Sequence, residues 1–548
     1  MASLRQSAPA LLLLLGFLTG SVLADDPLRT YDWTVSYSLL SPLDLEKMVI
    51  VINGQFPGPL LSVSTNDVAS VTVRNNLTEP FLLTWNGIQM RRNSWQDGAQ
   101  ETNCAIPAGG SWTYHFQVKD QIGSFFYYPT LLLQKAAGGY GAIRVNNRGD
   151  VVNLPLGCPC DEFDVLIGDW YNTDYRELRL PLQLGLPLSY QPDGVLINGV
   201  GPYQTNFLFK PGAAYRLRIS NVGLKASLNF RIQSHRMLLV ETEGSYTVQR
   251  QYESLDVHVG QSYSVIVRAD QPLGAYFMVA STRFLDDEVW GVATVRYSGF
   301  SGGPSSGHPP PGPDPLDYFF SMHQARTIRW NLSAEAARPN PQGSFQYGLI
   351  RETRFLLLEN DRANLDGLPR YTVNGVSFLH PDTPLKLADY FQIDDVFSPA
   401  AIPDVPDGRS PSSGTSVIDV PYRGYVHIVF QNSEDVIQSW HIDGYNFFVV
   451  GMDVGAWNES KRDSYNMVDA VSRSTVQVYP QGWTAVMTEL DNQGMWNIRS
   501  QMADRQFLGQ ELYLRVNGTR KGAPTASERD ELPLPGNAIL CGRAIGML

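Results

Sequence analysis

The chain has 548 residues, of which 18% are charged and 43% hydrophobic, and its formal net charge is −12. That length is too great for one hydrophobic core and fits three domains of ordinary size. The acidic balance argues against a nucleic-acid-binding protein and against nonspecific adsorption to anionic polysaccharide or lipid, although local arginine patches are compatible with either.

The N-terminal segment predicts a secreted protein. Residues 1–24 carry Arg5, an apolar run from Leu11 to Leu18 and a small residue, Ala24, before an acidic pair, which is the pattern of a cleaved signal peptide. The apolar run is too short to span a membrane. The C-terminal residues 539–548 are interrupted by Arg543 and lack the longer apolar tail of a GPI signal. We therefore expect a secreted product with neither a transmembrane segment nor a GPI anchor.

Secretion gives meaning to the sequons and the cysteines. A glycan on an Asn-X-Ser/Thr triplet requires passage through the secretory pathway. The four candidate glycosylation sites are Asn76, Asn331, Asn458 and Asn517. Of the four cysteines, Cys158 and Cys160 are two residues apart, so that free thiols, a strained disulfide and an intermolecular link all remain open for them.

Three copies of one strand pattern follow in chain order. Each copy has an Asn-Gly turn after apolar residues and then an alternating strand that ends in asparagine, and period-two alternation between such turns is typical of β-sandwiches. The turns are Asn53-Gly54, Asn198-Gly199 and Asn374-Gly375, and the strand-ending residues are Asn75, Asn221 and Asn432. This predicts an all-β protein with consecutive sandwich domains at 25–147, 161–299 and 317–548. Residues 300–316, rich in Pro and Gly, read as an extended linker, and 404–415 as a surface loop.

Four short stretches, 84–87, 127–130, 438–445 and 496–510, keep tryptophans and glycines in a recognisable frame. They resemble the motifs HWHG, YHxH, HPWHLHGH and WxxHCHxxxHxxxGM of the plant multicopper oxidases, ascorbate oxidase and laccase. Histidines at i and i+2 on a strand point to the same side, so that four such pairs can surround three copper ions. The positions that match those histidines carry Thr84, Asn86, Tyr128, Thr130, His441, Asp443, Arg499 and Gln501.

The blue-copper motif is equally depleted. That site needs two imidazoles, a thiolate and a weak axial thioether. The matching positions are Gln438, Ser500, Arg505 and Gln510. The whole chain holds 8 histidines, none in a His-X-His pair. We therefore predict no copper, no other cofactor and no catalytic residue at these positions. His441 is interpreted as a structural residue, and Arg499 and Asp443 are expected to form a salt bridge in place of the metal, because buried charges must be paired.

From about residue 29 to 541, the order of elements resembles three cupredoxin domains in series. The match is best to the plant Skewed and Skewed-similar family, which includes pollen-type ascorbate oxidase homologues. The resemblance implies a secreted glycoprotein that has lost its copper ligands and serves directional cell growth, cell-wall organisation or pollen-tube growth. By similarity to ascorbate oxidase, it also implies a disulfide between Cys104 and Cys541. We expect a non-catalytic protein of the cell wall or apoplast with an unknown wall ligand.

Two alternatives remain at this stage. One is an oxidoreductase of the ascorbate oxidase or laccase type with an unrecognised metal site. The other is a carbohydrate or small-molecule binder that uses the emptied cluster cavity; its polar lining would then be open, whereas in a structural role these side chains would bond one another. Trp85, Trp440 and Trp496 are expected to pack in the core. The carboxylate pairs Asp286-Asp287 and Glu434-Asp435 are interpreted as surface groups.

Overall fold

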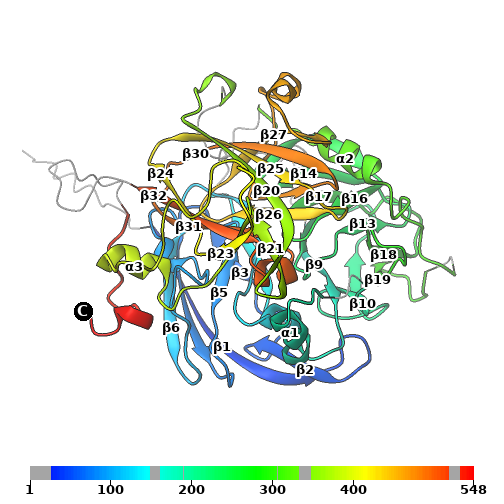
Figure 1. Ribbon diagram of the computed structural model, residues 1–548. Helices are drawn as coiled ribbons and strands as arrows, with labels where there is room; N and C mark the ends of the chain where they lie inside the picture. Colours follow the sequence, from blue (N-terminus) through cyan, green and yellow to red (C-terminus); the bar gives the residue numbers. More distant parts are fainter. Residues whose placement is uncertain are drawn as a thin grey trace, which may run out of the picture.

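The computed structural model describes residues 26–148, 161–188, 191–304, 307–332, 347–517 and 531–547. The predicted signal peptide, Cys158 and Cys160 lie outside this part of the chain. Within it, the strands form six sheets in three consecutive pairs (Figure 1). The predicted all-β class with three cupredoxin-like sandwiches is confirmed.

The first pair consists of two four-stranded sheets. Alternation shows along β4, where Ala69, Val71 and Val73 are fully buried and the residues between them are partly exposed. In sheet order, the strands are β2 (Lys47–Ile52), β1 (Leu28–Leu40), β4 (Val68–Asn75) and β6 (Ser111–Gln117), then β3 (Leu61–Ser64), β8 (Gly141–Asn146), β7 (Gly123–Pro129) and β5 (Leu83–Asn86).

The second pair has six and five strands. The larger sheet contains β10 (Gly194–Ile197), β9 (Asp161–Trp170), β12 (Ala214–Asn221), β17 (Ser262–Arg268), β14 (Met237–Thr242) and β15 (Ser245–Tyr252). The smaller contains β11 (Asn206–Phe209), β19 (Trp290–Tyr297), β18 (Ala275–Thr282), β13 (Leu228–Ile232) and β16 (Ser254–Val257).

The third pair has eight and five strands. The larger sheet contains β23 (Ser412–Gly414), β22 (Val376–Phe378), β21 (Leu368–Val373), β20 (Arg354–Leu365), β25 (Tyr425–Asn432), β30 (Gly482–Glu489), β27 (Phe447–Val454) and β28 (Ser472–Arg473). The smaller contains β24 (Val417–Pro421), β32 (Glu511–Asn517), β31 (Gly494–Ser500), β26 (Gln438–Ile442) and β29 (Thr475–Val478). The predicted loop at 404–415 is wrong at its end, because β23 adds to the sheet edge there.

Helices are short and lie between strands. The α-helices are α1 (Tyr175–Gln183), α2 (Tyr318–Thr327), α3 (Leu385–Phe391) and α4 (Ala503–Phe507). The 3-10 turns are η1 (Ser94–Gln96), η2 (Gln134–Ala137), η4 (Tyr347–Leu349), η5 (Glu459–Ser464) and η6 (Gly542–Ala544). None of the helices in the described residues is both long and apolar enough to cross a bilayer.

The Asn-Gly turns play the same part in each sandwich. Both residues of each turn have positive φ, as a tight hairpin turn of this type requires. Each asparagine also accepts a hydrogen bond from a backbone N–H of the neighbouring strand: Asn53 from Thr34, Asn198 from Leu166 and Asn374 from Glu359. The sequence repeat is therefore a repeat of bonded geometry.

The asparagines that end the alternating strands repeat in the same way. The side-chain oxygens of Asn75, Asn221 and Asn432 each accept from the backbone N–H two residues later. Their side-chain amides donate to backbone carbonyls elsewhere in the same sandwich, for example from Asn75 to Ile106 and from Asn221 to Val257. Each fixes the turn that leads toward the next strand.

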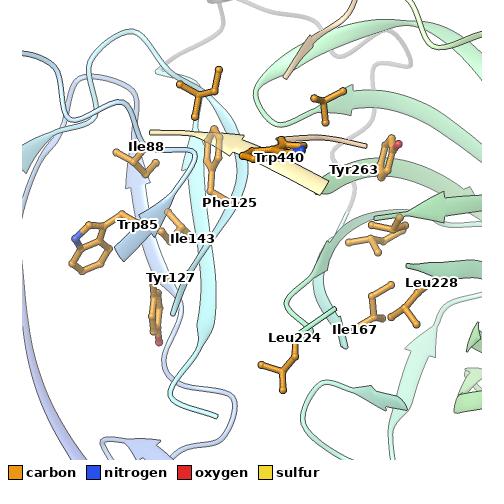
Figure 2. Close-up of a cluster of buried hydrophobic side chains, with 14 of the residues drawn as sticks. Trp85, Ile88, Phe125, Tyr127, Ile143, Ile167, Leu224, Leu228, Tyr263 and Trp440 are labelled. Atoms are coloured by element: carbon orange, nitrogen blue, oxygen red, sulfur yellow. The ribbon is translucent and has the colours of Figure 1, made fainter. Parts of the chain in front are cut away.

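One core cluster extends through all three sandwiches. Figure 2 shows Trp85 and Tyr127 on the first-domain strands, Ile167 and Leu228 on the second, and Trp440 on β26 between them. Trp85, Trp440 and Trp496 are 2%, 0% and 0% exposed, which confirms their expected packing role. Packed apolar side chains therefore form part of the contact between the domains.

Two segments lie along these domains. Residues 307–316 follow the second domain, where Pro310 accepts from Arg231 and Asp314 from Arg283. Residues 531–547 form a C-terminal strap beside β6 (Figure 1), fixed by Trp95 donating to Leu532 and Trp112 donating to Asn537. The strap is also bonded to the first domain by the disulfide between Cys104 and Cys541, which are 437 residues apart. The expected pairing is present.

Candidate functional site

The eight positions that match the copper cluster come from four strands and the residues that follow them. β5 and β7 pair Thr84 with Tyr128, and β26 and β31 pair His441 with Arg499. Except for Thr130, whose hydroxyl donates to Gly98, all eight are buried. These strands of the first and third domains therefore place their buried side chains around a common centre.

A salt bridge occupies that centre. Arg499 Nη1 donates to Asp443 Oδ2, and the other oxygen of Asp443 lies 2.9 Å from His441 Nε2. The three side chains are 1%, 4% and 0% exposed. The expected ion pair is present, with His441 as a third member.

Polar side chains join this centre across the domain boundary. The Arg499 Nη2 atom donates to the Tyr128 hydroxyl at 3.1 Å. Gln501 Nε2 donates to Asn86 Oδ1 at 2.8 Å, and Asn86 Nδ2 donates to the backbone oxygen of Gly260 at 3.2 Å. These bonds link all three domains. The Thr84 hydroxyl faces the same region without a hydrogen-bond partner.

Asp97 is a member of the site that sequence reasoning missed. Its side chain is 2% exposed, and burial and the neighbouring charge of Asp443 raise the pKa of Asp97 well above its usual value. The charge of Arg499 and the bond from His441 hold the pKa of Asp443 low in spite of burial. Burial therefore favours the protonated form of Asp97, whereas Arg499 and His441 favour the ionised form of Asp443.

Lys135 was also missed. It lies in η2, and its Nζ is 4.2 Å from the centroid of the Tyr128 ring, on which it forms a cation–π contact. Burial lowers the pKa of Lys135 to about 7, the charge of Asp169 raises it and that of Arg499 lowers it. Tyr128 therefore contacts two basic side chains, Lys135 over its ring and Arg499 at its hydroxyl.

These residues do not fit a copper cluster. His441 is the one imidazole among the eight positions, and its Nδ1 lies 2.8 Å from the Thr475 hydroxyl while its Nε2 faces Asp443. Burial lowers the pKa of His441, and the bond with Asp443 counters this in part. In the described part of the chain, no group of three or more His, Cys, Asp or Glu side chains is arranged to hold a metal ion. The donor set offers neither the number nor the type of ligand that copper requires.

The four blue-copper positions have become a second buried polar group. Arg505 forms a bidentate pair with Glu434, at 2.5 and 3.0 Å. Gln510 Nε2 donates to Gln438 Oε1 at 3.0 Å, and the Ser500 hydroxyl accepts from the backbone of Met502. The sequence interpretation of Glu434 as a surface carboxylate is therefore wrong, since its side chain is 10% exposed and neutralises a buried guanidinium.

A third buried pair connects the second domain to the cluster position. Glu243, in the turn between β14 and β15, accepts from Arg473 at 3.0 Å and from the backbone of Ser474 at 2.7 Å. The next residue, Thr475, contacts His441. Glu243 therefore links the second domain to the residue that contacts His441, because it also accepts from the backbone N–H of Thr475.

The predicted glycosylation sites lie at or near the surface. Asn76, Asn458 and Asn517 are exposed and Asn331 is half-buried. Asn458 Oδ1 accepts from the backbone of Ser460 at the start of η5. Nothing in the described fold prevents a glycan at the exposed positions.

Fold and site frame together define a multicopper-oxidase-like protein. Models of the multicopper oxidase family match residues 34–150, 161–300 and 382–521, and the chain belongs to this family.

Within the family, it is similar to plant monocopper oxidase-like proteins and L-ascorbate oxidase homologues. It is 48% identical over 559 residues to the monocopper oxidase-like protein SKS1 of Arabidopsis thaliana, covering 99% of this chain and 94% of that protein. It is 48% identical over 542 residues to an L-ascorbate oxidase homolog of Brassica napus, covering 97% and 96%. The resemblance to the Skewed and Skewed-similar family is thereby confirmed.

Enzymes of the family are more distant. The L-ascorbate oxidase of Cucumis sativus is 27% identical over 532 residues, covering 88% of each chain. Among solved structures, the multicopper oxidase Fet3p superposes with a TM-score of 0.76 at 18% identity, covering 89% of this chain and 90% of that one. That likeness is one of fold.

Proposed function

We propose that this chain is a secreted, glycosylated and non-catalytic protein of the cell wall or apoplast that serves directional cell growth or pollen-tube growth. The observation that carries the proposal is the pair of buried ion pairs, Arg499–Asp443 and Arg505–Glu434, at the two places where the family binds copper. A guanidinium is not a copper ligand, and its positive charge opposes a bound cation.

The bonding pattern favours a structural role over an open binding cavity at the cluster. Asn86, Tyr128, Asp443, Arg499 and Gln501 donate to or accept from one another. A ligand at this place would have to break these buried bonds, each of which costs about 1 to 3 kcal/mol when one partner is left unsatisfied. The role in the wall rests on family resemblance, because fold alone does not determine function.

The deciding experiment is metal analysis of the secreted protein after dialysis against copper, with ascorbate and phenol oxidation assayed on the same sample. We expect far less than one copper per chain, no blue absorption band and no turnover. An authentic ascorbate oxidase treated identically is the positive control. Stoichiometric copper with turnover would establish the rival function, an oxidoreductase with an unrecognised metal site, and overturn the proposal.

A further inference from the structure

A polar groove crosses the outer end of the second domain, away from the former copper positions. It is formed where β13, β14, β15 and β17 end, beside Pro310 to Pro313 and one side of α2. Two adjoining cavities of about 700 and 320 Å³ make up the groove, and they share Ser234, Arg236 and Gln251. Because the two cavities share these residues, they form one continuous groove.

The groove is basic although the chain is acidic. Arg231, Arg236, Arg250 and Arg268 line it, against the carboxylates Glu253 and Asp270. The whole chain carries a net charge of −12. A local excess of arginine on such a surface is a place where an anionic ligand is attracted without general adsorption of polyanions.

Arg231 forms the inner wall of the groove. Its side chain is 4% exposed, its Nε donates to Pro310 and its Nη1 to Ser281. Its Nη2 is buried 4.0 Å from the Glu288 carboxylate, and burial lowers the pKa of Arg231 to about 10. The positive charge that a ligand can reach is therefore that of the exposed Arg236, Arg250 and Arg268.

Gly312 packs directly against the Arg231 guanidinium. A Cβ at this position would lie 2.9 Å from Arg231 Nη1, so the segment from Pro310 to Pro313 covers this part of the groove wall closely. Beyond it, Ser234 and Gln251 are exposed and Phe320 is 36% exposed. Hydroxyl and amide groups beside a partly exposed ring match the hydroxyls and apolar faces of sugars.

We infer that this groove binds a linear oligosaccharide that carries carboxylates, of the uronic acid class. Arginine pairs with a carboxylate through two parallel charge-assisted hydrogen bonds, which a neutral sugar does not offer. The inference deepens the proposed wall function and rests on it for the choice of ligand. None of the residues that line the groove is at a position that matches a copper ligand.

The test is calorimetric titration of the full secreted protein with an oligogalacturonate. The variant Arg236→Gln/Arg250→Gln removes two exposed arginines of the groove and is expected to weaken binding by about tenfold or more, since each loses a charge-assisted hydrogen bond. The matched control is Arg74→Gln/Arg409→Gln, which removes the same charge from two ion-paired surface arginines elsewhere. Equal thermal midpoints will show that both variants are folded.

A gain of affinity gives a second, opposite readout. Glu253 forms an exposed ion pair with Arg236 at 3.4 Å and competes with an anionic ligand. Glu253→Gln should therefore tighten binding, whereas Glu46→Gln, an exposed charge in the first domain, should not.

Other probes separate the ligand classes. Methyl-esterified oligogalacturonate, which lacks the charge, should bind weakly. The inference is overturned if wild-type protein does not bind oligogalacturonate, if both double variants lose affinity equally, or if a single-stranded oligonucleotide binds as tightly at the same salt. Copper content of the same sample reports on the proposed function alone. A copper-free protein that fails to bind would thus refute the groove and leave that function standing.

Discussion

Arg499 holds Asp443 in a buried ion pair at two positions where the plant oxidases place copper-binding histidines. The pair is not isolated, because His441 and Tyr128 complete the hydrogen bonding of both charges. Such a pair contributes less to stability than an apolar core of the same volume, but removal of one partner strands the other charge. The joint between the first and third domains therefore depends on side chains that must remain together.

Replacing Arg499 should test this joint directly. Arg499→Met leaves Asp443 buried without its guanidinium partner, and we expect the free energy of unfolding, measured by urea titration, to fall by about 3 to 5 kcal/mol. Arg74→Met breaks an exposed pair with Asp32 and should leave the free energy of unfolding nearly unchanged. Equal effects at the two positions would contradict the burial argument.

Glu434 and its neighbour Asp435 form a natural comparison. Glu434→Gln weakens the bidentate pair with buried Arg505, so we expect a loss of about 2 kcal/mol or more. Asp435 is exposed, and Asp435→Asn should change stability little. Thermal midpoints of the two variants, measured side by side, will decide. If Glu434→Gln leaves the thermal midpoint unchanged, the ion pair with Arg505 does not contribute to stability, as expected for a surface carboxylate.

The contact of His380 with two glutamates predicts a pH dependence. His380 lies 2.9 Å from Glu101 of the first domain and 3.3 Å from Glu511 of the third. Burial lowers the pKa of His380, but the bond with Glu101 and the two carboxylate charges outweigh it, and the net pKa is raised above 6.5. Burial also raises the pKa of Glu101.

Both shifts have the same sign. A raised folded-state pKa means that the folded protein binds the proton more tightly, so the stabilisation from His380 is complete below pH 6.5 and is lost as pH rises through the raised value. We expect the thermal midpoint to fall between slightly acidic and slightly alkaline buffer. His380→Gln should flatten that slope, and His308→Gln, in the segment beside the second domain, should not. An unchanged slope in His380→Gln would contradict the assignment.

Loss of the disulfide should loosen the strap. Cys104→Ser/Cys541→Ser opens a loop whose ends are 437 residues apart, and loss of a disulfide costs up to about 5 kcal/mol. We expect a lower thermal midpoint and faster proteolysis within residues 531–547. Wild-type protein under reducing conditions should reproduce both effects. Unchanged proteolysis would mean that the hydrogen bonds from Trp95 and Trp112 suffice to hold the strap.

The fold was largely predictable because its signals are local. Asn53, Asn198 and Asn374 sit before glycine in a two-residue turn, and the same chemistry recurs wherever the chain repeats it. The site frame was predictable for a related reason, since alternation along a strand fixes which residues share a side. The pairing of Arg499 with Asp443 followed from charge and frame together.

The partners from elsewhere in the chain were not predictable. Asp97 and Lys135 meet the site from the first domain, hundreds of residues before Arg499. Glu434 precedes the residue it neutralises by 71 positions. No periodicity or motif relates such residues, and only the packed structure brings them together. The sequence offered one signal. An arginine at a position predicted to be buried requires a carboxylate partner, but the sequence does not identify that partner.

The strap has a mechanical consequence. Because Cys541 is bonded to Cys104, the chain from the first domain through the third forms a covalent ring. Tension that pulls the first and third domains apart is borne by two covalent paths, the polypeptide itself and the sulfur bridge. The bridge therefore limits how far the first and third domains can move apart, even when the hydrogen bonds between them break. Under load, a domain would unfold before these two domains separated.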